Sequence, residues 1–172
     1  MDIDRYAKGY RPGPAPRALG YMGFAAYEAI LPGIPENNSL ANLYVGLSIP
    51  EAEADVEYYW PAVVNECYYT MMQRYFFHMQ NEYAQLFGKI ELLRNELRTE
   101  YRKQISADLL DRSAKRGQDV GLAVYEWSAT DATSHNGFLD PQPASYIPPV
   151  GPGLWQPTFP DYNKAVFPYW GK

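Results

Sequence analysis

Apolar residues recur along most of this chain at intervals of three and four, close to the roughly 3.6-residue period of an α-helix. The clearest case is the stretch 81–105, whose apolar face is formed by Leu86, Ile90, Leu93, Leu97 and Tyr101. Charged residues of both signs occupy its other faces. The pattern predicts one long amphipathic helix, and the interleaved acids indicate a solvated outer surface rather than a nucleic-acid-binding one.

Two further stretches show a buried stripe at helical spacing. Residues 61–77 carry one formed by Val64, Tyr68, Met71 and Tyr75. Residues 106–128 carry another, formed by Leu110, Ala114, Gly117, Gly121 and Val124. Glycine inside a helix costs about 1 kcal/mol relative to alanine, so two glycines on one face predict the close approach of another backbone.

The N-terminal part adds an extended lead-in at residues 11–16 and a helix at 17–31 that ends at Pro32-Gly-Ile-Pro35. Small residues on several sides of this helix predict that it lies centrally and is closely packed. A short helix is expected at residues 39–47, with Ser39 as its N-cap. The chain shows no strand-like alternation. These elements together predict an all-α fold of about five helices in a bundle-like array.

An arm rich in proline and aromatic residues follows the helices. We assign residues 1–135 to the helical domain and residues 136–172 to this extended arm of the same domain. Proline fixes φ and removes a backbone donor, so the arm can neither continue a helix nor pair in the middle of a sheet. Its interaction residues are predicted to be Trp155, Phe159, Tyr169 and Trp170. We expect the arm to be ordered and to support a homodimer; a monomer with the arm packed on its own helices is the alternative.

The charge, the apolar runs and the cysteine content of the chain bear on whether it binds nucleic acid, spans a membrane or forms a disulfide. The formal charge of −5 at pH 7 argues against nucleic acid, which attracts basic surfaces. No apolar run approaches the roughly 18 residues of a membrane span, so none is expected. The lone cysteine, Cys67, excludes an internal disulfide and lies in an apolar helical stretch, where a buried structural thiol is the favoured interpretation.

Candidate catalytic side chains are few. His78 falls at a predicted helix end and His135 in the turn-like stretch Thr-Ser-His-Asn-Gly. Neither has a histidine or cysteine at ligand spacing, so no metal site is expected. Glu28 and Glu66 lie in apolar helices, where structural hydrogen bonding is favoured over an acid/base pair.

Four stretches resemble a known family, and they occur in the family's order. They are residues 14–29, Pro32-Gly-Ile-Pro35 with Ser39-Leu-Ala41, Ser113-x3-Gly117-x2-Val120-Gly-Leu-Ala123 with Trp127 and Asp131, and residues 152–160 with Ala165 and Pro168-Tyr-Trp-Gly171. They resemble the N-terminal helical region of bacterial proteins related to vanadium-dependent haloperoxidases, in the type 2 phosphatidic acid phosphatase superfamily.

The family's oxyanion-binding motifs are not matched. They are Lys-x6-Arg-Pro, Pro-Ser-Gly-His and Arg-x5-His. The single Arg-Pro of this chain is Arg11-Pro12, and Asp4 stands where the lysine would be. No catalytic, cofactor-binding or metal-binding residue can therefore be transferred, and by the resemblance the catalytic helices would follow Lys172.

The resemblance implies a non-catalytic helical part of a haloperoxidase-like or acid phosphatase-like enzyme, inactive alone, that packs against the catalytic helix bundle. Vanadate or phosphate would be bound only in a complete parent, and an exported or periplasmic location would follow. The alternative is a self-contained helical interaction protein whose arm binds a partner or a second copy. An enzyme that uses Glu28 and Glu66 is a third, weaker hypothesis.

Overall fold

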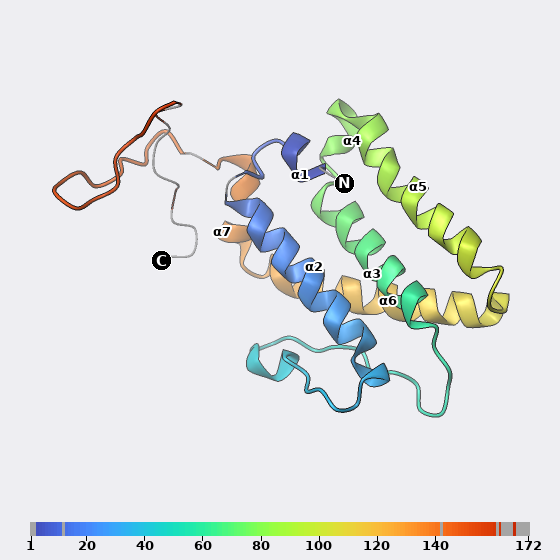
Figure 1. Ribbon diagram of the computed structural model, residues 1–172. Coiled ribbons are helices and arrows are strands. Elements are labelled where there is room, and N and C mark those ends of the chain that lie inside the picture. Colours follow the sequence, from blue (N-terminus) through green and yellow to red (C-terminus); the bar gives the residue numbers. More distant parts are fainter. Residues whose placement is uncertain (1–2, 12, 142, 161, 163–166, 168–172) are drawn as a thin grey trace.

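The computed structural model describes residues 3–11, 13–141, 143–160, 162 and 167 (Figure 1). Within these residues it contains α-helices, short 3-10 helices and no strand, which confirms the all-α prediction. The α-helices are α1 Ile3–Tyr6, α2 Pro14–Ile30, α3 Trp60–Tyr75, α4 Met79–Glu82, α5 Ala84–Tyr101, α6 Ala107–Ala129 and α7 Ala132–His135. The 3-10 helices are η1 Leu31–Gly33, η2 Ala41–Leu43 and η3 Gly137–Leu139.

The core lies where α2, α3 and α6 pack against one another, and α5 rests on the outer side of α3 (Figure 1). Each of the three inner helices contributes fully buried apolar side chains to one cluster. They include Met22, Ala25 and Ala29 of α2, Val63, Cys67 and Met71 of α3, and Val120 and Val124 of α6.

The contact between α3 and α6 is built on glycine. A Cβ atom added at Gly117 would lie 2.1 Å from the carbonyl oxygen of Val63, and one added at Gly121 would lie 3.3 Å from that of Cys67. Only a residue without a side chain lets the two backbones approach so closely. The predicted close approach at these two glycines is therefore confirmed.

Buried Arg116, in the middle of α6, forms hydrogen bonds to the end of α2. Its guanidinium donates hydrogen bonds to the carbonyl oxygens of Ala29 at 3.3 Å and Glu28 at 3.4 Å, and also to that of Pro50. These carbonyls belong to the last turn of α2 and to the loop that follows η2. A cation at a helix C-terminus is favourable because the orphan carbonyls and the helix dipole are negative there.

Two predicted N-terminal elements are wrong. The extended lead-in at residues 11–16 is wrong because α2 already begins at Pro14, and proline is well suited to the first turn of a helix. The helix expected at 39–47 is reduced to η2. Ser39 Oγ does accept a hydrogen bond from Ala41 N, at 3.1 Å, as its predicted capping role requires. The N–H groups of Leu40 and Ala41 also bind the carboxylate of Glu28, and Gly46 adopts φ +79°, so the helix does not extend to residue 47.

Two predictions about the later helices also need correction. The single helix expected at 81–105 is interrupted at Tyr83, whose φ of −131° and ψ of 45° are not helical, so α4 and α5 are separate. The stripe expected on α3 combines two faces. Met71 and Tyr75 are buried in the core as predicted, whereas Val64 and Tyr68 are half-buried and line a groove bordered by α5 and the end of α2.

The α2 helix is packed on fewer sides than expected. Its buried face meets α3 and α6, but Gly20 and Gly23 are exposed and a Cβ atom on either would meet nothing within 4 Å. Leu19, beside them, is 53% exposed. One side of this apolar helix is therefore open in the described structure.

The arm begins after η3. Phe138 still belongs to the folded body, because its ring packs against those of Tyr10 and His78. The described residues 143–160 have no helix or strand, as predicted, and lead away from the helices in Figure 1. No helix in the described part of the chain has both the length and the apolarity needed to cross a membrane.

Candidate functional site: an apolar groove and an aromatic arm

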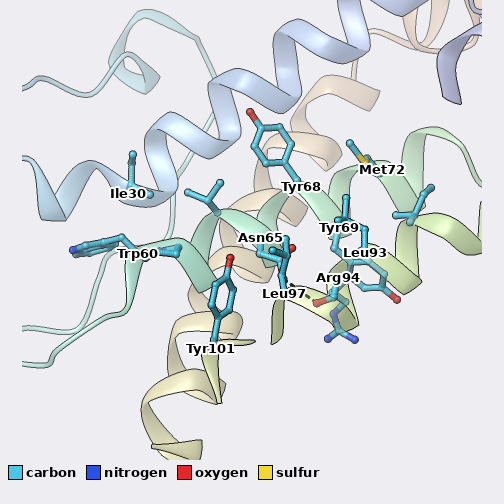
Figure 2. Close-up of a pocket in the computed structure, with 13 residues that line it drawn as sticks. Ile30, Trp60, Asn65, Tyr68, Tyr69, Met72, Leu93, Arg94, Leu97 and Tyr101 are labelled. Atoms are coloured by element: carbon cyan, nitrogen blue, oxygen red, sulfur yellow. Dashed lines mark hydrogen bonds between the residues drawn. The ribbon is translucent and has the colours of Figure 1, made fainter. Parts of the chain in front are cut away.

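A groove of about 630 Å³ runs between α3 and α5 (Figure 2). Its lining residues recur at helical spacing on both helices, so two parallel stripes form its walls. They are Pro61, Val64, Asn65, Tyr68, Tyr69 and Met72 from α3, with Trp60 at its start, and Ile90, Leu93, Arg94, Leu97 and Tyr101 from α5, together with Ile30 of α2. Trp60 and Tyr101 lie toward one end in Figure 2, and Met72 lies at the other.

Aromatic donors line this groove without using their hydrogens inside the molecule. The hydroxyls of Tyr68, Tyr69 and Tyr101 and the indole nitrogen of Trp60 make no hydrogen bond to any other described residue. Burial raises the pKa of Tyr69 and of Tyr101, so both phenols keep their protons at neutral pH. The groove therefore combines an apolar surface with several available hydrogen-bond donors.

An ion-pair network beside the groove fixes α5 to α3. Arg94 donates to both carboxylate oxygens of buried Glu66, at 3.0 Å from Nε and 2.7 Å from Nη2. Arg98 lies 3.4 Å from the same carboxylate and 2.8 Å from Asp111 of α6. The hydrogen bond to Glu66 raises the pKa of Arg94. Because its cation is matched by this acid, the Arg94 wall does not present an unpaired charge to the groove.

Glu28 has a different structural role. Its carboxylate accepts hydrogen bonds from Ser39 Oγ at 2.9 Å, from Leu40 N at 2.7 Å and from Ala41 N at 3.2 Å. The acid thus holds η2 onto α2. Glu28 and Glu66 share no partner, and each is satisfied by its own network, as the preference for structural hydrogen bonding predicted.

The two histidines pack among aromatic rings. His78 is stacked between Tyr10 and Phe138, with ring centroids 5.3 Å and 4.8 Å away. Burial lowers the pKa of His78, and the nearby Tyr75 carbonyl opposes this only in part. Neither ring nitrogen has a well-formed hydrogen bond to another described residue.

His135 ends α7 rather than lying in an exposed loop, with its Nε2 3.4 Å from the hydroxyl of Tyr125. Cys67 is fully buried, as predicted, and burial raises the pKa of its thiol to about 12. Among the described residues, no group of three or more histidine, cysteine or acidic side chains could hold a metal ion.

The predicted interaction residues of the arm divide into two pairs. Trp155 is 49% exposed and Phe159 is 81% exposed, so both present apolar surface to solvent. Tyr169 and Trp170 lie outside the described residues. The stretch 147–160 contains no charged side chain, and Ile147 and Val150 are also exposed within it. The role of the arm in binding stays a prediction.

Comparison with known proteins gave no match, whether the chain was compared with family models, with curated proteins or with solved structures. The resemblance to haloperoxidase-like proteins therefore stays a prediction. The groove, including Trp60, Tyr69 and Met72, was not predicted from the sequence. A signal was present, because 64, 68 and 72 form a second helical stripe displaced by one residue from the buried 63, 67 and 71.

Proposed function

We propose that this chain is a non-catalytic helical packing module, equivalent to the N-terminal helical part of a vanadium haloperoxidase-like or acid phosphatase-like enzyme. The observation that carries the proposal is the open side of α2. Gly20 and Gly23 leave the backbone of an apolar helix accessible there, next to a hollow lined by Tyr21, Phe24 and Tyr44. A helix of the catalytic bundle would pack against this side, while vanadate or phosphate would be held by the bundle.

Glycine in a helix interior costs stability unless close approach of another element compensates for it. At Gly117 and Gly121 the approaching element is α3, within the same chain. Gly20 and Gly23 have no such neighbour among the described residues. By analogy with Gly117 and Gly121, two unpartnered glycines on one side of α2 support the approach of a helix from the catalytic part of the enzyme.

The first test is activity. The chain alone should show no haloperoxidase turnover with vanadate and no phosphatase turnover, because the transition-state charge has no preorganised partner without the family's oxyanion motifs. Turnover above a protein-free blank would contradict the proposal. The DNA downstream of the Lys172 codon should encode the three missing motifs, in the same reading frame or an adjacent one.

The second test is assembly with the polypeptide encoded there. We expect association, and Gly20→Leu and Gly23→Leu should weaken it by about tenfold or more by blocking close approach. Gly88→Leu on α5 is the matched control, since Gly88 is also an exposed helical glycine without neighbours. Equal binding by all three variants would contradict a role for this side of α2.

A second candidate function is a self-contained interaction protein that binds through its arm. The exposure of Trp155 and Phe159 favours it, because large apolar side chains gathered at a surface often mark an interaction site. Removal of both rings should then abolish binding to the partner or to a second copy.

A further inference from the structure

We propose that the groove between α3 and α5 binds the Pro-rich segment 147–160 of a second copy of this chain. The inference rests on the second candidate function, the interaction protein, and identifies the surface that its arm binds. It does not require the open side of α2.

The lining of the groove matches the chemistry by which Pro-rich segments are recognised. Pro-rich segments in an extended conformation bind grooves lined by aromatic side chains, because the preformed backbone loses little conformational entropy on binding. The segment contains two Pro-x-x-Pro stretches, Pro149-Val-Gly-Pro152 and Pro157-Thr-Phe-Pro160. Residues 147–150 and 155–158 are free of turns, and a turn at 151–154 separates them. The groove is lined by one tryptophan and three tyrosines.

Hydrogen bonding also favours this pairing. A Pro-rich backbone has more acceptors than donors, because each proline keeps its carbonyl and lacks the N–H. The groove offers donors to match, because the hydroxyls of Tyr68, Tyr69 and Tyr101 make no hydrogen bond to another described residue. An amphipathic helix would fill the groove less well, because its carbonyls are already used in its own hydrogen bonds.

Charge favours the same pairing. Residues 147–160 are uncharged, and the Arg94 cation in the groove wall is matched by Glu66 at 2.7 Å. An uncharged segment can therefore be buried there without leaving an ion unpaired, which would be costly. A negatively charged partner would gain little from Arg94, because the charge of Arg94 is already paired with Glu66.

The position of the arm favours a second copy over the same chain. In Figure 1 the arm leaves the molecule beside α2 and α7 and leads away from the helices, whereas α5 lies on the far side of α3. The groove lies between α3 and α5, away from the start of the arm. Two copies can exchange arms reciprocally, which gives a closed dimer with two identical contacts.

The experiment uses the full chain and sedimentation velocity over a range of concentrations. We expect a dimer. The arm variant Trp155→Ser with Phe159→Ser should be monomeric, and so should the groove variant Leu93→Glu, each with dimer affinity at least about tenfold lower. Leu92→Glu is the matched control, because Leu92 is 57% exposed on the same helix and does not line the groove, whereas Leu93 is 44% exposed and does. Circular dichroism should show all variants folded.

Mixing the two defective variants is the decisive step. The arm variant keeps a working groove and the groove variant keeps a working arm, so the mixture should form a heterodimer although each protein alone is monomeric. A synthetic peptide of residues 147–160 should compete with the wild-type dimer.

Four outcomes would overturn the proposal. They are a monomeric wild-type chain, a dimer that survives Leu93→Glu, loss of the dimer in Leu92→Glu as well, and a mixture that stays monomeric. A dimer that needs the arm and not the groove would retain the second candidate function while rejecting this binding surface.

Discussion

The α3 helix meets its two neighbours in opposite ways. Toward α6 the contact is made by Gly117, Gly121 and small buried side chains, and the backbones touch. Toward α5 the contact is made by large aromatic side chains and an ion pair, and a groove remains between the helices. The difference indicates that one face of α3 is closely packed inside the fold, whereas the other leaves an apolar groove open at the surface.

The largest expected effect breaks the close contact. Gly117→Ala should destabilise the protein by about 3 kcal/mol or more, because its new Cβ atom would lie 2.1 Å from a backbone oxygen that cannot rotate away. Gly121→Ala should cost less, since its nearest contact would be 3.3 Å. Urea unfolding measures both values. Equal stabilities for these two variants and the parent would contradict the close-packing account.

The next largest effect tests whether the contact of α3 with α5 is independent of its contact with α6. Glu66→Gln should lower stability by about 1–3 kcal/mol, because Arg94 and Arg98 lose their shared carboxylate while remaining partly exposed to water. Hydrogen exchange should accelerate in α5 and stay slow in α6. Uniform acceleration in both helices would show that the two contacts are not independent. Glu96→Gln, an exposed change on the same helix outside this ion-pair network, is the control.

A smaller effect depends on pH. Burial lowers the pKa of His78 below its unfolded value of 6.5, so the folded state disfavours the protonated ring. The contribution of His78 to the free energy of unfolding is therefore fully present above about pH 6.5 and is lost as the pH falls below that value. His78→Phe should reduce the loss of urea resistance between about pH 7.5 and 5. An unchanged pH profile would rule out this contribution.

The smallest expected effect is a gain. Gly88 lies on the exposed side of α5 with nothing within 4 Å of an added Cβ atom, so Gly88→Ala should stabilise the protein by about 0.5–1 kcal/mol. The same substitution would then lower the free energy of unfolding at Gly117 on α6 and raise it at Gly88 on α5. Thermal unfolding at a fixed pH is a sufficient measurement, and a destabilised Gly88→Ala would contradict the open environment of this residue.

The sequence was most informative where one face of a helix determines its environment. The periodicity around Leu110 and Val124 located α6, and the cost of Gly117 within it predicted the close contact correctly. Periodicity could not divide α3 correctly, because a helix with neighbours on two sides carries two overlapping stripes, and Val64 and Tyr68 were combined with Met71. The break at Tyr83 and the short η2 depend on backbone dihedrals and on the distant Glu28, which local pattern does not encode.

The candidate site was only partly accessible from sequence. The aromatic arm could be recognised because its prolines and its aromatics are adjacent in the chain. For the groove, the sequence showed only the α3 stripe of Val64, Tyr68 and Met72. Its pairing with α5 could not be predicted, because Trp60 and Tyr101 are brought together only when α5 folds back along α3. The partners of Glu28 and Glu66 were likewise set by tertiary contacts rather than by spacing.

The guanidinium of Arg116 also constrains the order of folding. Its bond to the carbonyl of Ala29 joins residues 87 positions apart, and its bond to Pro50 joins residues 66 apart. The chain must close these long loops, at a cost in entropy, before the contacts can stabilise it. Folding is therefore slower than local helix formation alone would allow. During synthesis, α2 and α3 emerge first and have their apolar faces uncovered until α6 follows. We therefore expect folding to be completed only when α6 joins them.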